Sequence, residues 1–262
     1  TAYAISACLV GSEMCIRDRD MSLKNNRKIA FLTAGGIAPC LSASIGALII
    51  EYVKKFPDVE MIGYSHGYKG LLLGNHIPIN EKVKQNANIL FDFGGSPIGN
   101  SRVKLTNTDD CVNRGFIKKG QDPLEVAAQQ LVKDNVSILH TIGGDDTNTM
   151  AASLVEILEK KGIELTVVGL PKTVDNDVYP IFQTLGASTA AEQSAVFFEN
   201  IANENTTSHR QLIIHEVMGR NCGWLTAASA QIYRKQLQAK QFLPEFLISK
   251  KRWDIHAIYI PE

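Results

Sequence analysis

The chain has 262 residues, 45% of them hydrophobic and 21% charged, and its 27 basic side chains balance its 27 acidic ones. This composition is typical of a globular protein with one large or two modest domains, and it gives no general attraction for nucleic acid or for an anionic membrane. No apolar run reaches the length of a membrane span. The five cysteines show no metal-type spacing, which favours reduced thiols and a cytoplasmic location.

The first twenty residues differ from the rest of the chain. Residues 2–11 form a short apolar patch with no basic segment before it, which makes a poor secretory signal. Met21 has the character of a natural start. We therefore expect residues 1–20 to be a leader that is foreign to the fold.

Apolar runs and turns then alternate in a way that predicts an α/β protein with a mainly parallel, doubly wound sheet. The expected elements, in chain order, are a strand at 27–33, a helix at 38–55, a strand at 59–64, a helix at 122–133, a strand at 136–142, a helix at 147–161, a strand at 165–170, a helix at 188–201, a strand at 211–217, a helix at 226–236 and a strand at 255–260.

Two glycine-rich turns in the first half are candidate anion sites. Gly35 and Gly36 separate the first strand from a helix with Pro39 in its first turn, a position where free backbone N–H groups can face an anion. A second glycine-rich loop, 93–102, ends in Arg102 and reads either as a surface turn or as a phosphate clamp. Neither turn has the pattern of a dinucleotide fingerprint or of a Walker A loop, which argues against those two sites.

Two acidic turns follow the strands at 136–142 and 165–170. The first is Gly143-Gly144-Asp145-Asp146-Thr147 and the second is Pro171-Lys172-Thr173-Val174-Asp175-Asn176-Asp177. The carboxyl ends of parallel strands meet at one edge of a sheet, where open α/β sheets bind their ligands. We therefore expect these acidic and basic side chains to line one cleft.

Each acidic turn has a functional and a structural interpretation. Asp145 could bind Mg²⁺ together with phosphate oxygens and water, or it could cap the helix that follows. Asp175 could accept the proton of an attacking hydroxyl, or it could belong to an Asx-turn. The spacing alone leaves both alternatives open.

The chain resembles the phosphofructokinase family from about residue 27 to the end, because five motifs occur in the order in which that family has them. These motifs are Gly35-Gly36, the loop to Arg102, Gly143-Gly144-Asp145, Thr173-Val174-Asp175-Asn176-Asp177 and Met218-Gly219-Arg220. The resemblance implies two Rossmann-like domains, with a phosphoryl-donor domain at 21–185 and an incomplete sugar-phosphate domain at 186–262. It also implies that the family's chain continues beyond Glu262, so we expect this chain to be C-terminally truncated.

The resemblance also implies roles for individual residues. Asp145 would hold Mg²⁺, Asp175 would be the base on the 1-hydroxyl of fructose 6-phosphate, and Arg220 and Lys172 would assist the transfer. The phosphoryl donor would be bound by Gly35, Gly36, Arg102, Asp146, Thr147 and Lys172. The sugar phosphate would be bound by Thr173, Val174, Asp175, Met218, Gly219 and Arg220.

Two positions bear on the choice of donor. Members that use ATP resemble Gly-Gly-Asp-Gly and Pro-Gly-Thr, whereas this chain has Asp146 and Lys172 at the second glycines. A carboxylate about 4 Å from a nucleotide phosphate costs roughly 4 kcal/mol at an effective dielectric of 20, a discrimination of about a thousandfold. Lys172 could pair with Asp146 or with pyrophosphate. The resemblance therefore implies a pyrophosphate-dependent member of the family.

Other functions remain as alternatives. They are an ATP-dependent phosphofructokinase, an NAD or lipid kinase with a Gly-Gly-Asp motif, and an inactive fragment that acts only as a binding module. An NAD or lipid kinase would leave the motif Met218-Gly219-Arg220 unexplained. The resemblance further implies fructose 6-phosphate and pyrophosphate as substrates and a homo-oligomer, dimeric or tetrameric, with no nucleic-acid or membrane partner.

Overall fold

The computed structural model describes residues 28–36, 38–207, 211–219 and 222–260. The chain divides into two compact units, Thr1–Lys172 (unit 1) and Thr173–Glu262 (unit 2). In the described part, no helix combines the length and the apolar character needed to cross a bilayer.

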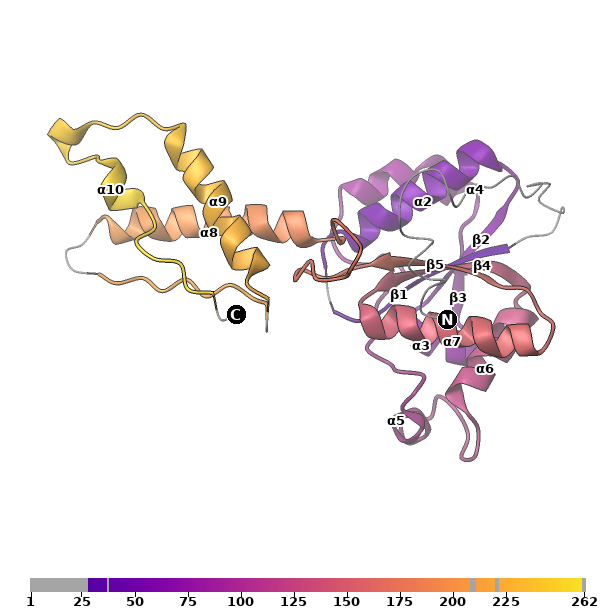
Figure 1. Cartoon of the computed structure of the whole chain (residues 1–262). Coiled ribbons are helices and arrows are strands. Elements are labelled where there is room, and N and C mark those ends of the chain that lie inside the picture. The colour runs from indigo at the N-terminus through magenta and orange to yellow at the C-terminus, as the bar shows by residue number, and fades with distance from the viewer. Residues whose placement is uncertain (1–27, 37, 208–210, 220–221, 261–262) are drawn as a thin grey trace. The chain divides into compact units, whose positions relative to one another are not determined.

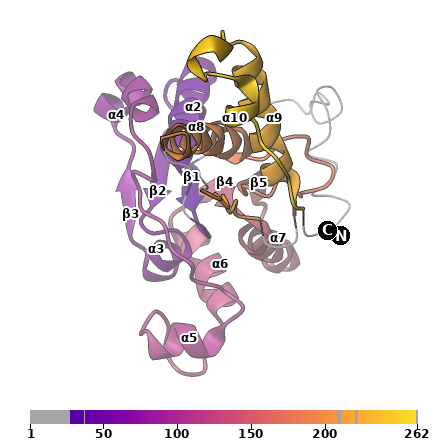
Figure 2. The same ribbon diagram turned by 90° about the vertical axis from the view of Figure 1, so that its left-hand side faces the viewer.

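Unit 1 is built on a five-stranded sheet. The strands are β1 (Lys28–Thr33), β2 (Glu60–Tyr64), β3 (His76–Pro78), β4 (Val136–Gly143) and β5 (Thr166–Pro171). Their order across the sheet is β3-β2-β1-β4-β5, as the view in Figure 2 shows. All neighbours are parallel except β3, which runs antiparallel to β2 at one edge. The expected mainly parallel sheet is therefore confirmed.

Helices cover both faces of this sheet. Helix α2 (Leu41–Lys55) lies on one face, and α3 (Tyr68–Leu73), α6 (Pro123–Lys133) and α7 (Asp145–Lys160) lie on the other (Figure 1). Strand β1 is accordingly buried on both faces, and its residues 29–33 are all buried. A continuous apolar run of this kind is what a strand between two helical layers requires.

The boundaries of several elements differ from the sequence-based expectation. Helix α2 begins at Leu41 with Cys40 at its N-cap, so Pro39 precedes the helix instead of occupying its first turn. The carbonyl of Pro39 accepts a hydrogen bond of 3.2 Å from the amide of Gly95, which ties this residue to the glycine-rich loop. Seven short elements of the described residues were not expected: β3, α3, α4 (Glu81–Gln85), the 3-10 turn η1 (Ala87–Phe91), α5 (Thr108–Asn113) and, in unit 2, the 3-10 turn η2 (Pro244–Phe246) and α10 (Lys250–Trp253).

Unit 2 is a helical pair with extended segments beside it. Helix α8 (Ala187–Asn205) packs on α9 (Trp224–Gln238), where the rings of Phe198 and Tyr233 meet edge to face at 4.7 Å between centroids. The Tyr233 hydroxyl donates a 2.5 Å hydrogen bond to the carbonyl of Trp253 at the end of α10 (Lys250–Trp253). The remaining short element is η2 (Pro244–Phe246).

The strands expected at 211–217 and 255–260 are wrong. Both segments belong to no strand, and no ladder joins either of them to a neighbour among the described residues. A strand needs a partner for its backbone N–H and C=O groups, and a run of residues that favour strands does not by itself supply one. Leu212 and Ile214 are 85% and 84% exposed, so these apolar side chains are not covered either. The described part of unit 2 thus contains no sheet of the expected second Rossmann-like domain.

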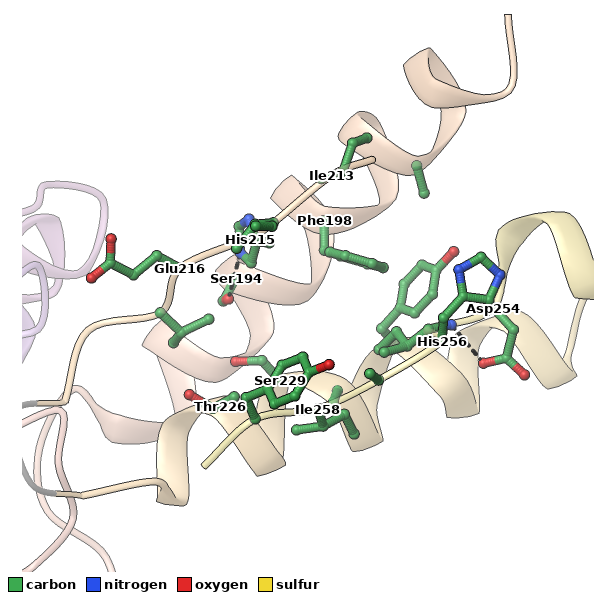
Figure 3. A pocket seen from close by; sticks show the side chains of 18 of the residues that line it. Ser194, Phe198, Ile213, His215, Glu216, Thr226, Ser229, Asp254, His256 and Ile258 are labelled. Atoms are coloured by element: carbon green, nitrogen blue, oxygen red, sulfur yellow. Dashed lines mark hydrogen bonds between the residues drawn. The ribbon is translucent and has the colours of Figure 1, made fainter. Parts of the chain in front are cut away.

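The two extended segments border a hollow of ≈ 950 Å³ in unit 2 (Figure 3). Its lining is mainly apolar and comes from four parts of the chain: Ser194 and Phe198 on α8, Thr226 and Ser229 on α9, Ile213 and His215 on one extended segment, and His256 and Ile258 on the other. His215 is held by Ser194, whose Oγ lies 3.3 Å from its Nε2.

Candidate functional site

The candidate site of unit 1 lies where β1, β4 and β5 end. The strand order places β1 and β4 side by side, while the chain goes from β1 to β2 on the opposite side. This is the point at which the direction of winding reverses, and α/β sheets bind ligands in the crevice outside such a point. Gly35-Gly36 follows β1, Gly144 follows β4 and Lys172 follows β5.

The turn after β1 is fixed by the loop that ends in Arg102. The amide of Gly35 donates a 2.9 Å hydrogen bond to the carbonyl of Ser101, and the carbonyl of Gly35 accepts one of 2.8 Å from Nδ2 of Asn100. Gly35 has a φ of 88°, which glycine adopts without strain. Its amide is therefore already used, so an anion at this turn must be bound by neighbouring groups.

Strand β4 and helix α7 approach the end of β1 very closely. A Cβ atom on Gly143 would lie 2.5 Å from Oγ1 of Thr147 and 2.7 Å from the carbonyl oxygen of Ala34, so only glycine fits. Thr147 is itself fixed, because its carbonyl accepts a 2.6 Å hydrogen bond from the hydroxyl of the buried Tyr68. The site thus has a rigid floor made of backbone.

The N-terminus of α7 supplies the polar groups of this floor. Gly144 is the N-cap, and the amides of Thr147 and Asn148 both bond to its carbonyl. The amides of Asp145 and Asp146 precede these bonds and have no backbone acceptor in the described part of the chain, as expected for the first turn of a helix. Such amides, together with the helix dipole, favour an anion. The interpretation of Asp145 as a helix cap is wrong, because Asp145 is the first helical residue.

Lys172 lies beside these turns as a buried cation. Its backbone amide bonds to the carbonyl of Gly143 at 2.9 Å, and its Nζ would lie 3.6 Å from a Cβ on Gly36. Lys172 is only 5% exposed. Burial is the main cause that lowers the pKa of Lys172; Cys40 opposes this and the nearby Arg102 adds to it. A buried cation whose charged form is disfavoured by burial and by a neighbouring cation would be stabilised by a bound anion.

Asp146 does not pair with Lys172. Its Oδ2 lies 2.5 Å from Nζ of Lys104, a residue that the sequence analysis did not consider. No local sequence pattern predicts this role of Lys104, because its side chain contacts Asp146 from a separate loop. Lys172 is therefore left without a carboxylate partner among the ion pairs of the described residues.

The residues present fit Mg²⁺ only in part. Asp145 is an exposed carboxylate in the first turn of α7, and the described residues contain no group of three or more His, Cys, Asp or Glu side chains that could hold a metal ion. Mg²⁺ usually binds through one or two carboxylates, completing its shell with water and substrate phosphate. The described residues therefore offer the carboxylate of Asp145 and no cage of protein ligands.

In unit 2 the second acidic turn is held by two neighbouring side chains. Oγ1 of Thr173 accepts the amide of Asp175 at 3.1 Å, and Oδ1 of Asn176 accepts the amide of Thr184 at 2.8 Å. Oγ1 of Thr184 donates to the carbonyl of Thr173 at 2.7 Å, which closes the loop. The turn thus relies on Thr173 and Asn176, and Asp175 is half-buried within it, as is Val174.

Residues of the last motif meet this turn. Sγ of Cys222 donates to the carbonyl of Asp175 at 2.9 Å, and a Cβ on Gly219 would lie 3.9 Å from Oδ1 of Asp175. The same Cβ would be 2.4 Å from the carbonyl oxygen of Cys222, so Gly219 cannot carry a side chain without a shift of backbone. Met218 is 75% exposed. Arg220, the remaining expected ligand, lies outside the described residues.

Comparison with known proteins shows the family to which the chain belongs. Residues 28–243 match the family described as "Phosphofructokinase". The chain is 59% identical over 236 residues to a pyrophosphate--fructose 6-phosphate 1-phosphotransferase of Methylomonas methanica and 54% identical over 236 residues to one of Mastigamoeba balamuthi. Each alignment covers 90% of this chain and 58% of the relative, so the chain spans little more than half of these proteins.

A solved structure gives the same fold. The chain superposes with a TM-score of 0.67 and 21% identity on a pyrophosphate-dependent phosphofructokinase from Marinobacter aquaeolei, covering 79% of this chain and 49% of that one. The residues that match the phosphofructokinase family make up most of the chain, from the first strand of unit 1 to a point in unit 2 beyond α9. The chain belongs to the phosphofructokinase family.

Proposed function

We propose that the protein to which this chain belongs transfers a phosphoryl group from pyrophosphate to the 1-hydroxyl of fructose 6-phosphate, in a reversible reaction of sugar breakdown. The observation that carries the proposal is the buried Lys172 beside the glycine turn after β1 and the open first turn of α7. Relatives that are 59% and 54% identical to this chain over 236 aligned residues bear the name of this activity.

Unit 1 is proposed as the donor site. Gly35, Gly36 and Thr147 form its floor, and Lys172 and Arg102 face the phosphates. Asp146 lies where the rest of a nucleotide would approach, so its carboxylate and its bulk disfavour ATP relative to pyrophosphate. An ATP-dependent reaction remains the second candidate, because an exposed carboxylate held by Lys104 repels a nucleotide less than a free one would.

The acceptor chemistry is proposed for unit 2. Asp175 accepts the proton of the 1-hydroxyl, the hydroxyl oxygen bonds to the terminal phosphorus of pyrophosphate, and the bond from that phosphorus to the bridging oxygen breaks. Phosphate leaves, and fructose 1,6-bisphosphate is the product. Thr173, Val174, Met218, Gly219 and Arg220 are proposed to bind the sugar phosphate, and Arg220 also stabilises the charge of the transferred group.

Asp145 is proposed to hold Mg²⁺. The ion, when bound with the donor, neutralises charge on the phosphate oxygens. The chain's own contribution is the carboxylate at the N-terminus of α7, whose amides remain available to the donor. We also propose cytoplasmic activity as a homo-oligomer, dimeric or tetrameric, with domains at 21–185 and 186–262 for donor and sugar phosphate.

The test is the formation of fructose 1,6-bisphosphate by the chain extended to the length of its relatives, with Mg²⁺ and either pyrophosphate or ATP. Activity with pyrophosphate is expected, and Asp175→Asn should lower kcat by about a hundred- to ten-thousandfold because the general base is lost. Binding of pyrophosphate should persist in that variant. Equal turnover by Asp175→Asn and wild type would refute the role of Asp175, and activity with ATP alone would refute the choice of donor.

A further inference from the structure

Asp146 presents an electrostatic problem at a site proposed for an anion. It lies in the first turn of α7, beside the amides that the helix offers to phosphate. A second carboxylate, that of Asp145, precedes it directly. Pyrophosphate carries several negative charges, so an unpaired carboxylate at this position would oppose the binding of any phosphoryl donor, including pyrophosphate.

Lys104 removes this conflict. Its Nζ lies 2.5 Å from Oδ2 of Asp146, although both side chains are more than half exposed. An exposed ion pair contributes little to folding stability, because solvent screens it and ordering two side chains costs entropy. The pair therefore needs a different explanation, and its place beside the donor site provides one.

The backbone around Lys104 is fixed on both sides. Val103 and Leu105 are each 1% exposed, and the amide of Leu105 donates to Sδ of Met150 of α7 at 2.9 Å. The carbonyl of Lys104 accepts the amide of Asn107 at 3.1 Å. Because the neighbours on either side are buried in contact with the core, the side chain of Lys104 is directed outward at the level of the first turn of α7.

The same segment carries a second cation of the site. Arg102 and Lys104 are two residues apart, both are exposed, and the buried Val103 separates them. Ser101, one residue earlier, accepts the amide of Gly35 at 2.9 Å. A single extended segment, 101–105, therefore links the turn after β1, the two cations and helix α7.

We propose that Lys104 is a positioning and specificity-determining residue, which through its ion pair with Asp146 allows the acidic first turn of α7 to accept pyrophosphate. This inference rests on the proposed function. Three cations, Arg102, Lys104 and Lys172, and two anions, Asp145 and Asp146, leave one positive charge in excess at this end of the sheet. Without Lys104 the excess disappears.

The pairing also decides what Lys172 can do. Asp146 was the expected carboxylate partner of Lys172, but its carboxylate is paired with Lys104. Lys172 is consequently available to the donor. Asp146 can thus obstruct a nucleotide by its bulk without cancelling the cation that pyrophosphate needs.

The test is calorimetric titration of the 262-residue chain with pyrophosphate in the presence of Mg²⁺. Lys104→Gln is expected to raise the Kd about tenfold, equivalent to about 1.4 kcal/mol, because it exposes the donor to the uncompensated carboxylate. Lys104→Arg should bind nearly as wild type does. The double variant Lys104→Gln/Asp146→Asn should return to within about threefold of Asp146→Asn, since the carboxylate that pairs with Lys104 is then absent.

A second exposed ion pair of unit 1 provides the matched control. Lys161 pairs with Glu125, with both side chains about 40% exposed, and lies at the C-terminal end of α7, away from the first turn. Lys161→Gln should leave the Kd unchanged. Both Lys104→Gln and Lys161→Gln should melt within about 2 °C of wild type, because neither pair contributes much to stability.

The outcomes separate this inference from the proposed function. If wild type fails to bind pyrophosphate, the donor site and this inference fall together. If wild type binds but Lys104→Gln binds equally well, the role of Lys104 is refuted while the proposed function stands. If Asp146→Asn does not rescue Lys104→Gln, Lys104 acts on the donor directly, and the positioning role is refuted.

Discussion

Replacement of Gly143 by alanine tests whether the donor site depends on the close approach of β4 and α7 to β1. The new methyl group would lie 2.5 Å from Oγ1 of Thr147 and 2.7 Å from the carbonyl oxygen of Ala34. Favourable contacts of carbon begin at roughly 3.5 Å, so about 0.8–1 Å of relief is needed. Thr147 is 2% exposed and cannot swing into solvent. The backbone of α7 or of β1 must therefore move.

The expected cost is that of overpacking in a rigid environment, about 1–3 kcal/mol. For a domain of this size each kcal/mol lowers Tm by about 2–4 °C, so a decrease of roughly 2–12 °C should be seen by calorimetry. A displacement of about 1 Å at the first turn of α7 also moves the amides that face the donor. We expect pyrophosphate transfer to fall by about a hundredfold.

The adjacent glycine provides the control for stability. A Cβ on Gly144 would have one neighbour, the carbonyl oxygen of Lys172 at 3.9 Å, and Gly144 has a φ of −77°, which alanine adopts freely. Gly144→Ala should therefore cost no more than about 1 kcal/mol, the usual loss on placing alanine at an N-cap. If Gly143→Ala is as stable as Gly144→Ala and binds pyrophosphate normally, the close approach is not required.

Two further variants examine buried titratable groups. Lys172→Met should abolish pyrophosphate binding yet raise Tm by a few degrees, because it removes a buried cation without a carboxylate partner. Burial lowers the pKa of Lys172 below its usual 10.5, so folding of the wild type at neutral pH requires burying the charged form. The difference in stability between variant and wild type should therefore decrease as pH rises toward 10.5, where the unfolded wild type also loses this proton. Retained binding with a lower Tm would contradict this. His140 is buried in β4 beside the hydroxyl of Tyr52, 2.7 Å from its Nε2, and burial lowers its pKa from 6.5 to about 4. The folded state therefore favours neutral His140: stability is complete above pH 6.5 and falls as pH decreases toward 4, by about 2–3 kcal/mol at pH 4.5. Urea unfolding at pH 7 and pH 4.5 should show a smaller loss for His140→Gln than for wild type, and equal losses would refute the assignment.

The long elements of the fold could be predicted because their patterns are local. Helix α6 begins with Asp122 as its N-cap, whose Oδ1 accepts the amide of Leu124 at 3.0 Å, followed by Pro123, the expected start signals. Strand β4 is an apolar run between two turns. Helix α3 escaped prediction because Gly70 lies inside it, and the glycines around it are typical of a loop. Gly70 is required by packing, since a Cβ there would lie 2.1 Å from the carbonyl oxygen of Ser65.

The segment 211–217 shows the opposite failure. Its run of residues that favour strands predicts a strand, yet the structure leaves it extended and unpaired. Such a composition shows that a segment is suited to a sheet, but whether a neighbouring strand lies beside it is a property of the tertiary structure. The same limit applies to the site. Glycine and acidic residues after strands indicate the turns, whereas the ion pair of Lys104 with Asp146 depends on how loops from separate elements meet.

The order of the strands explains why the turns could be recognised singly and not as a group. Gly35 follows β1 and Gly144 follows β4, with two strands and several helices between them in the chain, but β1 and β4 are neighbours in the sheet. No local signal in either segment specifies that adjacency. Once it is formed, the amide of Gly144 and the hydroxyl of Thr147 each lie 3.6 Å from the position of a Cβ on Gly35. The contacts that define this cradle all lie within unit 1, and those that hold the turn of Asp175 lie within unit 2. The proposed binding of the donor and the proposed proton transfer from the acceptor are thus assigned to separate compact units, so a variant that loses one should be able to retain the other.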